Sequence, residues 1–141
     1  MSAENDAGGF PPRGVTTILR IEGLAVLVAT LFAYQALGGN WWLFALLILA
    51  PDLSMLGGLL SPAFGARAYN AAHTYSVPMV LAGLAWLAGA AWLLPLALIW
   101  IAHIGVDRAL GYGLKYPGAF DRTHLGPIGK AKRAQKLADA G

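Results

Sequence analysis

Four long apolar segments, separated by short polar or glycine-rich connections, dominate the chain. They cover about residues 17–37, 41–60, 68–89 and 95–114. A helix needs about 20 apolar residues to cross the ~30 Å hydrocarbon core of a bilayer, and these segments have about that length. The pattern predicts an all-α protein whose residues 17–115 form a four-helix transmembrane bundle. A flexible polar leader (1–16) precedes it, and a cytoplasmic loop and basic tail (116–141) follow.

Two of the four segments contain features that are unusual in a membrane helix. The second carries Pro51 and Asp52 near its middle. Proline removes one backbone donor and crowds the carbonyl four residues earlier, so a kink is expected there. The third segment begins with polar residues, Asn70 and His73 among them, and becomes apolar only beyond Pro78.

Composition and charge place the chain in a membrane with a defined orientation. It is 57% hydrophobic and 12% charged, whereas about 25% of the residues of a soluble domain are charged. The connections around 38–40 and 90–94 contain no Lys or Arg, while the basic residues fall on the other side. By the positive-inside rule both termini are cytoplasmic. The net charge of +3 is too small to suggest a nucleic-acid partner. The absence of cysteine excludes disulfides and thiolate ligands.

Four ionisable side chains fall at one depth in three of the predicted spans: Asp52, His73, His103 and Asp107. Ionisable residues cost roughly 2.5–3.5 kcal/mol each in a bilayer core, so they suggest a function. His103 and Asp107 are four residues apart and share one helix face. Two histidines and two carboxylates suit a divalent metal, of which Zn²⁺ is our first choice. A hydrogen-bonded polar plug that fixes helix packing, and a proton or ion relay, are the alternatives.

Other polar residues near the cytoplasmic side are candidates for supporting roles. As carriers of protons we select Glu22, Asp121 and His124, the last two because they lie in a Gly/Pro segment that can fold back over the bundle. For substrate binding we select Arg108, Tyr112 and Asn70, led by the planar guanidinium, which suits phosphate or carboxylate. Simpler explanations exist for these residues: Glu22 could pair with an arginine, His124 could be solvated, and the aromatic and basic side chains could anchor the protein in the membrane.

The text of these motifs resembles a family of small four-helix bacterial membrane proteins known only as a domain of unknown function. The matching stretches are RIEGLAVL, WWLFALLILAPDLSMLG, AYNAAHTY and HIGVDRALGYGLKYPGAFDRTHLG. More distantly, the order of a PD, an H-T and an HxxxD element is similar to that of membrane-bound metal-dependent hydrolases. That similarity implies metal ligation by the four residues above. Those hydrolases typically carry a second acidic residue soon after the PD, where this chain has Leu53 and Ser54, so a single metal is expected.

Together these features predict an integral protein of the bacterial inner membrane that binds one divalent metal. We expect a hydrolase that acts on a lipid-like ester or phosphoester at the cytoplasmic leaflet, with membrane lipids as its surroundings. A small transporter or proton relay is one alternative, although the outer halves of the spans are almost purely aliphatic. A structural membrane protein is the other. Four short spans bury little surface, which favours a homo-oligomer.

Overall fold

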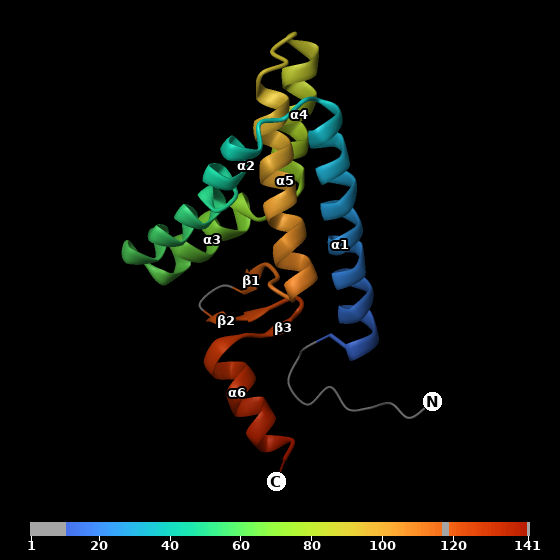
Figure 1. Cartoon of the computed structure of the whole chain (residues 1–141). Helices are drawn as coiled ribbons and strands as arrows, with labels where there is room; N and C mark the ends of the chain where they lie inside the picture. The colour runs from blue at the N-terminus through green and yellow to red at the C-terminus, as the bar shows by residue number, and fades with distance from the viewer. Residues whose placement is uncertain (1–10, 117–118, 141) are drawn as a thin grey trace.

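The computed structural model describes residues 11–116 and 119–140, and the chain is mostly helical. Figure 1 shows its elements in order. The bundle contains α1 (Arg13–Ala36), α2 (Trp41–Leu47), the 3₁₀ helix η1 (Ala50–Leu59), α3 (Pro62–Ala72), α4 (Ser76–Leu87) and α5 (Leu93–Leu110). A small sheet follows, made of β1 (Lys115–Tyr116), β2 (Ala119–Thr123) and β3 (Gly126–Pro127). The last element is α6 (Gly129–Ala138).

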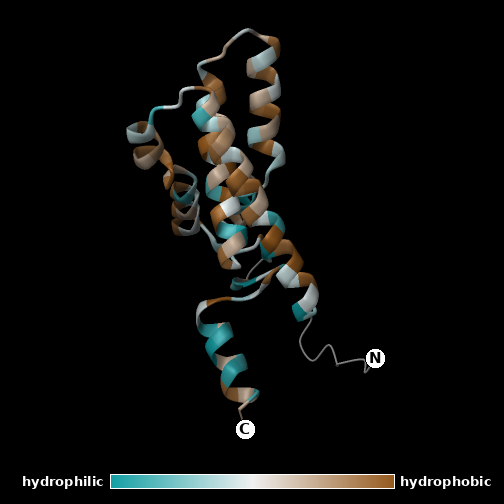
Figure 2. Cartoon of the chain, turned by 45° about the vertical axis from the view of Figure 1, so that its right-hand side comes forward, coloured by the Kyte–Doolittle hydropathy of each residue, from teal (hydrophilic) through white to brown (hydrophobic). Residues whose placement is uncertain are grey.

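Three helical segments are long and apolar enough to cross a membrane. They are Arg13–Ala36, Trp41–Leu59 and Leu93–Leu110, with 24, 19 and 18 residues. Most of their apolar side chains face outward, as lipid-facing residues would. Figure 2 shows the same contrast, with hydrophobic residues along the bundle and hydrophilic residues gathered on α6. Three of the four expected spans therefore correspond to helices of sufficient length.

The expected third span, 68–89, is not one helix. The structure divides it into α3, which begins earlier, at Pro62, and α4, which has 12 residues, with a break at residues 73–75. Pro78 explains the restart, because proline fits only in the first turn of a helix, and Pro78 is the third residue of α4. The break leaves His73 at the end of α3 rather than inside a continuous helix.

The expected kink in the second span is present as a change of helix type. The α-helical part ends at Leu47, and the 3₁₀ helix η1 begins at Ala50, one residue before Pro51. η1 and α3 form a slanted hairpin that leans away from the upright helices α1, α4 and α5 (Figure 1). This hairpin brings Asp52 and His73 beside the C-terminal half of α5, which carries His103 and Asp107.

Helices α1 and α5 pack closely through glycine. A Cβ at Gly105 would lie 3.1 Å from the Gly23 carbonyl oxygen, and a Cβ at Gly23 would lie 3.0 Å from the backbone nitrogen of Ala109. Small residues allow this backbone approach, which is a common way for membrane helices to associate. α5 therefore packs against α1 through one face, and His103 and Asp107 lie on a different face of α5.

The segment after α5 folds as a small antiparallel sheet of order β1-β2-β3, which departs from the all-α expectation. Lys115 pairs with Thr123, and Thr123 pairs with Gly126. The Asn70 side chain joins this sheet to α3, since it donates to the Lys115 carbonyl (2.8 Å) and accepts from the Lys115 N–H (2.7 Å). The basic tail forms α6 beyond the sheet. The start of α1, the sheet and α6 lie at the same end of the bundle (Figure 1).

Candidate metal centre

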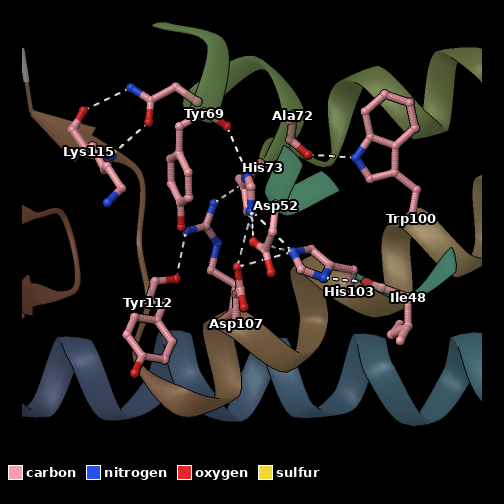
Figure 3. A network of polar contacts seen from close by, with 12 residues as sticks. Ile48, Asp52, Tyr69, Ala72, His73, Trp100, His103, Asp107, Tyr112 and Lys115 are labelled. Carbon is pink, nitrogen blue, oxygen red and sulfur yellow. Dashed lines mark hydrogen bonds and ion pairs between the residues drawn. The ribbon is translucent and has the colours of Figure 1, made fainter. Parts of the chain in front are cut away.

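Two histidines and two aspartates from three segments meet beside α5 (Figure 3). We call Asp52, His73, His103 and Asp107 the Asp/His cluster. Asp52 comes from the first turn of η1, His73 from the end of α3, and the other two from successive turns of α5. One donor atom from each residue lies within 4.8 Å of every other. All four residues that the sequence selected as metal ligands are therefore brought together.

The spacing of the donor atoms suits a small cation. The two Nε2 atoms are 3.1 Å apart. His73 Nε2 lies 3.2 Å from Asp52 Oδ1 and 3.4 Å from Asp107 Oδ2, and His103 Nε2 lies 3.4 and 3.5 Å from the same two oxygens. Four ligands about 2.0–2.1 Å from a tetrahedral zinc ion are separated from one another by about 3.3–3.4 Å. These five distances are close to those of such a site, and all four donor atoms lie within 4.8 Å of one another, so the residues could hold one metal ion.

The orientation of His103 follows from the change of helix type in the second span. Pro51 has no N–H, and the N–H of Asp52 bonds to the Leu49 carbonyl, so neither reaches the Ile48 carbonyl. That carbonyl lies 2.6 Å from His103 Nδ1 instead. A ring nitrogen facing a carbonyl carries the proton and donates it. His103 is therefore held with its Nε2 lone pair toward the Asp/His cluster.

The ring of His73 is held in the same tautomer by a different set of contacts. Its Nδ1 lies 2.8 Å from the Tyr69 carbonyl oxygen, to which it donates. The Tyr69 ring stacks on the imidazole, with centroids 3.8 Å apart and planes 12° apart. The backbone on either side is fixed as well, because Arg108 donates to the His73 carbonyl (2.9 Å) and Trp100 to the Ala72 carbonyl (2.6 Å). Such contacts to the distal nitrogen and backbone are typical of metal-binding histidines.

These tautomers leave acceptor atoms facing one another at the centre of the Asp/His cluster. With both Nδ1 protons donated to carbonyls, the two Nε2 atoms present lone pairs, and the carboxylates add negative oxygens. Lone pairs and negative charge at such short range repel one another in a medium of low dielectric constant. A bound cation removes that repulsion, and so does a proton shared between the histidines. The arrangement therefore needs positive charge at its centre.

The Asp/His cluster is closed on the side of the histidines and open at Asp52. The side chains of His73 and His103 are 1% and 3% exposed, and that of Asp107 is 17% exposed, whereas that of Asp52 is 40% exposed. A structural zinc site is closed, and a catalytic one keeps a position for water or substrate. Asp52 marks the side from which a ligand can reach the centre.

The other residues selected from the sequence lie around the Asp/His cluster rather than in it. Glu22, Arg108 and His124 line one cavity of about 610 Å³ on the α1 side. Asn70 is engaged with the Lys115 backbone, and Tyr112 is half-exposed and receives a 3.3 Å hydrogen bond from Arg108 through its carbonyl. Asp121 lies on β2, and its backbone carbonyl accepts from the Ile128 N–H.

A second cavity, of about 450 Å³, lies on the other side of α5, with an almost entirely apolar lining. It is formed by Leu47, Ala50, Pro51, Ser54, Ala72, Leu81, Leu96, Ile99 and Trp100. Pro51 and Ala72 directly precede two members of the Asp/His cluster in the sequence. The cavity therefore begins next to the centre and extends along α5 between apolar side chains.

Sequence reasoning missed three aromatic residues that shape the site. Tyr69 stacks on His73, and Trp100 donates to the carbonyl of Ala72 at the end of α3. Tyr75 lines the cavity on the α1 side, and its buried hydroxyl has no hydrogen-bond partner among the residues that the structure describes. Tyr69 lies four residues before His73, so its position on the same helix face was a signal available in the sequence. The contacts of Trp100 and Tyr75 depend on how the helices cross, which the sequence pattern does not contain.

Outside the long apolar helices, burial shifts the pKa values of two basic side chains in the region of the sheet. Desolvation, reinforced by the nearby Arg108 cation, lowers the pKa of His124, whose Nδ1 accepts from the Leu114 N–H at 2.8 Å. Desolvation also lowers the pKa of Lys115, whose ammonium lies 4.6 Å from the centre of the Tyr69 ring. His124 is therefore neutral at pH 7 and can accept or donate a proton near the cavity on the α1 side.

Comparison with known proteins gives one match, to a family of unknown function. The sequence model of a family described as a domain of unknown function (DUF4260) matches residues 16–128. Neither the curated proteins nor the solved structures contain a significant match. The matched range includes the sheet and all of the bundle except the first three residues of α1.

Proposed function

The chain belongs to the DUF4260 family of unknown function, and from its site we propose that it is a membrane-embedded, metal-dependent hydrolase. The Asp/His cluster would hold one divalent cation, with Zn²⁺ the best fit to two imidazoles and two carboxylates. One observation carries the proposal: four acceptor atoms converge within 4.8 Å, with both Nδ1 atoms turned away to carbonyls. Such an arrangement is costly without positive charge between the donors.

The metal and the surrounding residues would divide the work of hydrolysis. When bound, a divalent cation lowers the pKa of a coordinated water to about 7 and polarises an ester or phosphoester oxygen. His73 and His103, the two buried ligands, and the largely buried Asp107 would fix its position. Asp52 would be the fourth and most exposed ligand, so a water or substrate oxygen could reach the metal beside it. Glu22, Asp121 and His124 remain our proposed carriers of protons to and from bulk water.

The surroundings of the Asp/His cluster support a lipid-like substrate. The cavity of about 450 Å³ has aliphatic and aromatic walls along α5, which suit an acyl chain. The cluster itself lies in the half of α5 nearest the sheet, the end that the distribution of basic residues assigns to the cytoplasm. A substrate whose ester lies at headgroup depth and whose chain enters the apolar cavity would reach the cluster from the cytoplasmic leaflet of the bacterial inner membrane.

Metal analysis with matched variants tests the proposal. We expect the purified wild-type protein to contain one zinc ion per chain, and His103→Ala to contain far less. His124→Ala, a histidine outside the cluster, is the control and should retain the metal. Asp52→Asn, which keeps an oxygen donor on the exposed ligand, should lower the zinc content less than His103→Ala does and should reduce hydrolysis of short-chain lipid esters. Absence of stoichiometric metal from the wild type would end the hydrolase proposal.

A proton relay is the second candidate, and the 3.1 Å contact between the two Nε2 atoms favours it. Without metal, a proton shared by His73 and His103 would supply the positive charge that the Asp/His cluster needs. This candidate predicts metal-free protein and pH-driven proton flux in liposomes that His103→Ala abolishes. Zinc-containing protein without flux excludes it.

A further inference from the structure

The cavity between α1 and α5 contains a buried cation that forms no ion pair with any carboxylate of the described residues. Arg108 is 8% exposed. Its guanidinium donates to the carbonyls of His73 (2.9 Å) and Tyr112 (3.3 Å), and in the described part of the chain it forms no ion pair with a carboxylate. Arginine stays protonated in proteins, so burial cannot remove its charge. A buried charge without a counterion is costly and indicates a place for an anion.

A second polar group of the same cavity also lacks a partner. The Tyr75 hydroxyl is buried and has no hydrogen-bond partner among the described residues, although buried hydroxyls are normally bonded. Tyr75 and Arg108 both line the cavity of about 610 Å³. An oxyanion there would accept hydrogen bonds from both side chains, which satisfies the hydroxyl and neutralises the guanidinium together.

From these two observations we propose that the cavity between α1 and α5 binds the phosphate group of an anionic lipid, with Arg108 and Tyr75 as its donors. Arg108 directly follows Asp107 and bonds the carbonyl of His73, so a phosphate held there lies next to the Asp/His cluster. The inference rests on the proposed function and narrows it, since it makes the substrate a phospholipid rather than a neutral ester.

Glu22 restricts the charge of that ligand. Its carboxylate belongs to the same cavity and forms no ion pair among the described residues. A dianionic phosphate monoester would be repelled by it, and a phosphodiester, with a single negative charge, would be repelled less. We therefore assign a phosphodiester headgroup to the cavity.

Direct binding of soluble ligands to the full-length protein in neutral detergent tests this assignment. The probes are dihexanoylphosphatidylglycerol, a singly charged phosphodiester, its uncharged counterpart dihexanoylglycerol, dihexanoylphosphatidate and inorganic phosphate. We expect the phosphodiester to bind more tightly than both the neutral lipid and the phosphatidate. Glu22→Gln should reduce the preference for the phosphodiester over the phosphatidate. Binding of inorganic phosphate as tight as that of the lipid would overturn the assignment of a lipid phosphodiester.

Three variants separate the anion site from folding and from the metal. Arg108→Gln should weaken binding of the phosphodiester at least about 30-fold, and Tyr75→Phe about tenfold. Arg20→Gln is the control, because Arg20 is exposed and likewise donates to a carbonyl, that of Ala109. Zinc content is measured on the same samples, so loss of metal and loss of anion binding are recorded independently. Unchanged phosphodiester binding in folded Tyr75→Phe, or equal binding of the neutral lipid, would overturn the inference.

Discussion

Removal of the metal from the Asp/His cluster should lower the thermal stability of the protein by an amount that can be estimated. A ligand that binds only the folded state at 100 to 1,000 times its dissociation constant stabilises that state by about 2.7–4.1 kcal/mol. Unfolding has an entropy of about 2.1 cal/mol/K per residue, which for 141 residues makes 1 kcal/mol equal to roughly 3.4 °C. Chelation should therefore lower the melting temperature of the wild type by about 9–14 °C.

Differential scanning fluorimetry in detergent, with and without chelator, measures this shift. His103→Ala removes one of the two imidazoles, whose Nε2 lies 3.1–3.5 Å from the other donor atoms. This variant should melt at one temperature under both conditions, because it has little metal to lose. His124→Ala keeps the Asp/His cluster and should show the wild-type shift. An unchanged melting temperature of the wild type on chelation, or an equally large decrease in His103→Ala, would refute the reasoning.

Three further predictions concern the scaffold around the site. Gly23→Ala places a methyl group against the α5 backbone, where the nearest backbone atom would be 3.0 Å away. It should destabilise the bundle by about 1–3 kcal/mol. The control Gly14→Ala, whose added methyl group would have no atom within 4 Å, should leave the melting temperature unchanged in the same assay. Asn70→Ala removes two hydrogen bonds to the Lys115 backbone and should cost about 2 kcal/mol; faster hydrogen exchange in the sheet but not in α1 would confirm the location, and unchanged exchange would contradict it. The pKa of His124 is lowered in the folded state, so below its unfolded value of about 6.5 the unfolded chain binds more protons and stability falls as the pH drops. In chelated protein His124→Asn should lose its part of this decline below about pH 6.5, and an unchanged pH profile would contradict the assignment.

The polar residues of the membrane segments were the part of the site that the sequence predicted best. Ionisable groups are rare in apolar helices, so Asp52, His73, His103 and Asp107 stood out, and counting residues along each span placed them at one depth. Their convergence did not require correct helix boundaries. Three apolar helices of spanning length were predictable for a different reason, because the thickness of a bilayer sets the length of an apolar segment that can cross it.

The departures arise where local backbone chemistry overrides the apolar pattern. Pro78 was visible in the sequence, yet the apolar residues on its far side suggested one continuous span, and the structure breaks the helix at residues 73–75. The sheet of β1, β2 and β3 was not predicted, because its strands are short and the backbone of Lys115 is hydrogen-bonded to Asn70, which lies on α3, far away in the sequence. The position of Glu22 in a different cavity from the Asp/His cluster depends on helix rotation, which depth alone does not determine.

The order of the four ligands along the chain has a consequence for biogenesis. Asp52 and His73 leave the ribosome about 30 residues or more before His103 and Asp107, so during synthesis the nascent protein holds only half of its donors. Likewise, the Ile48 carbonyl cannot accept its hydrogen bond from His103 Nδ1 until α5 has been synthesised. If the protein binds the metal as proposed, loading is a late event that follows insertion of α5, and a chain truncated before residue 103 should bind no metal at this site.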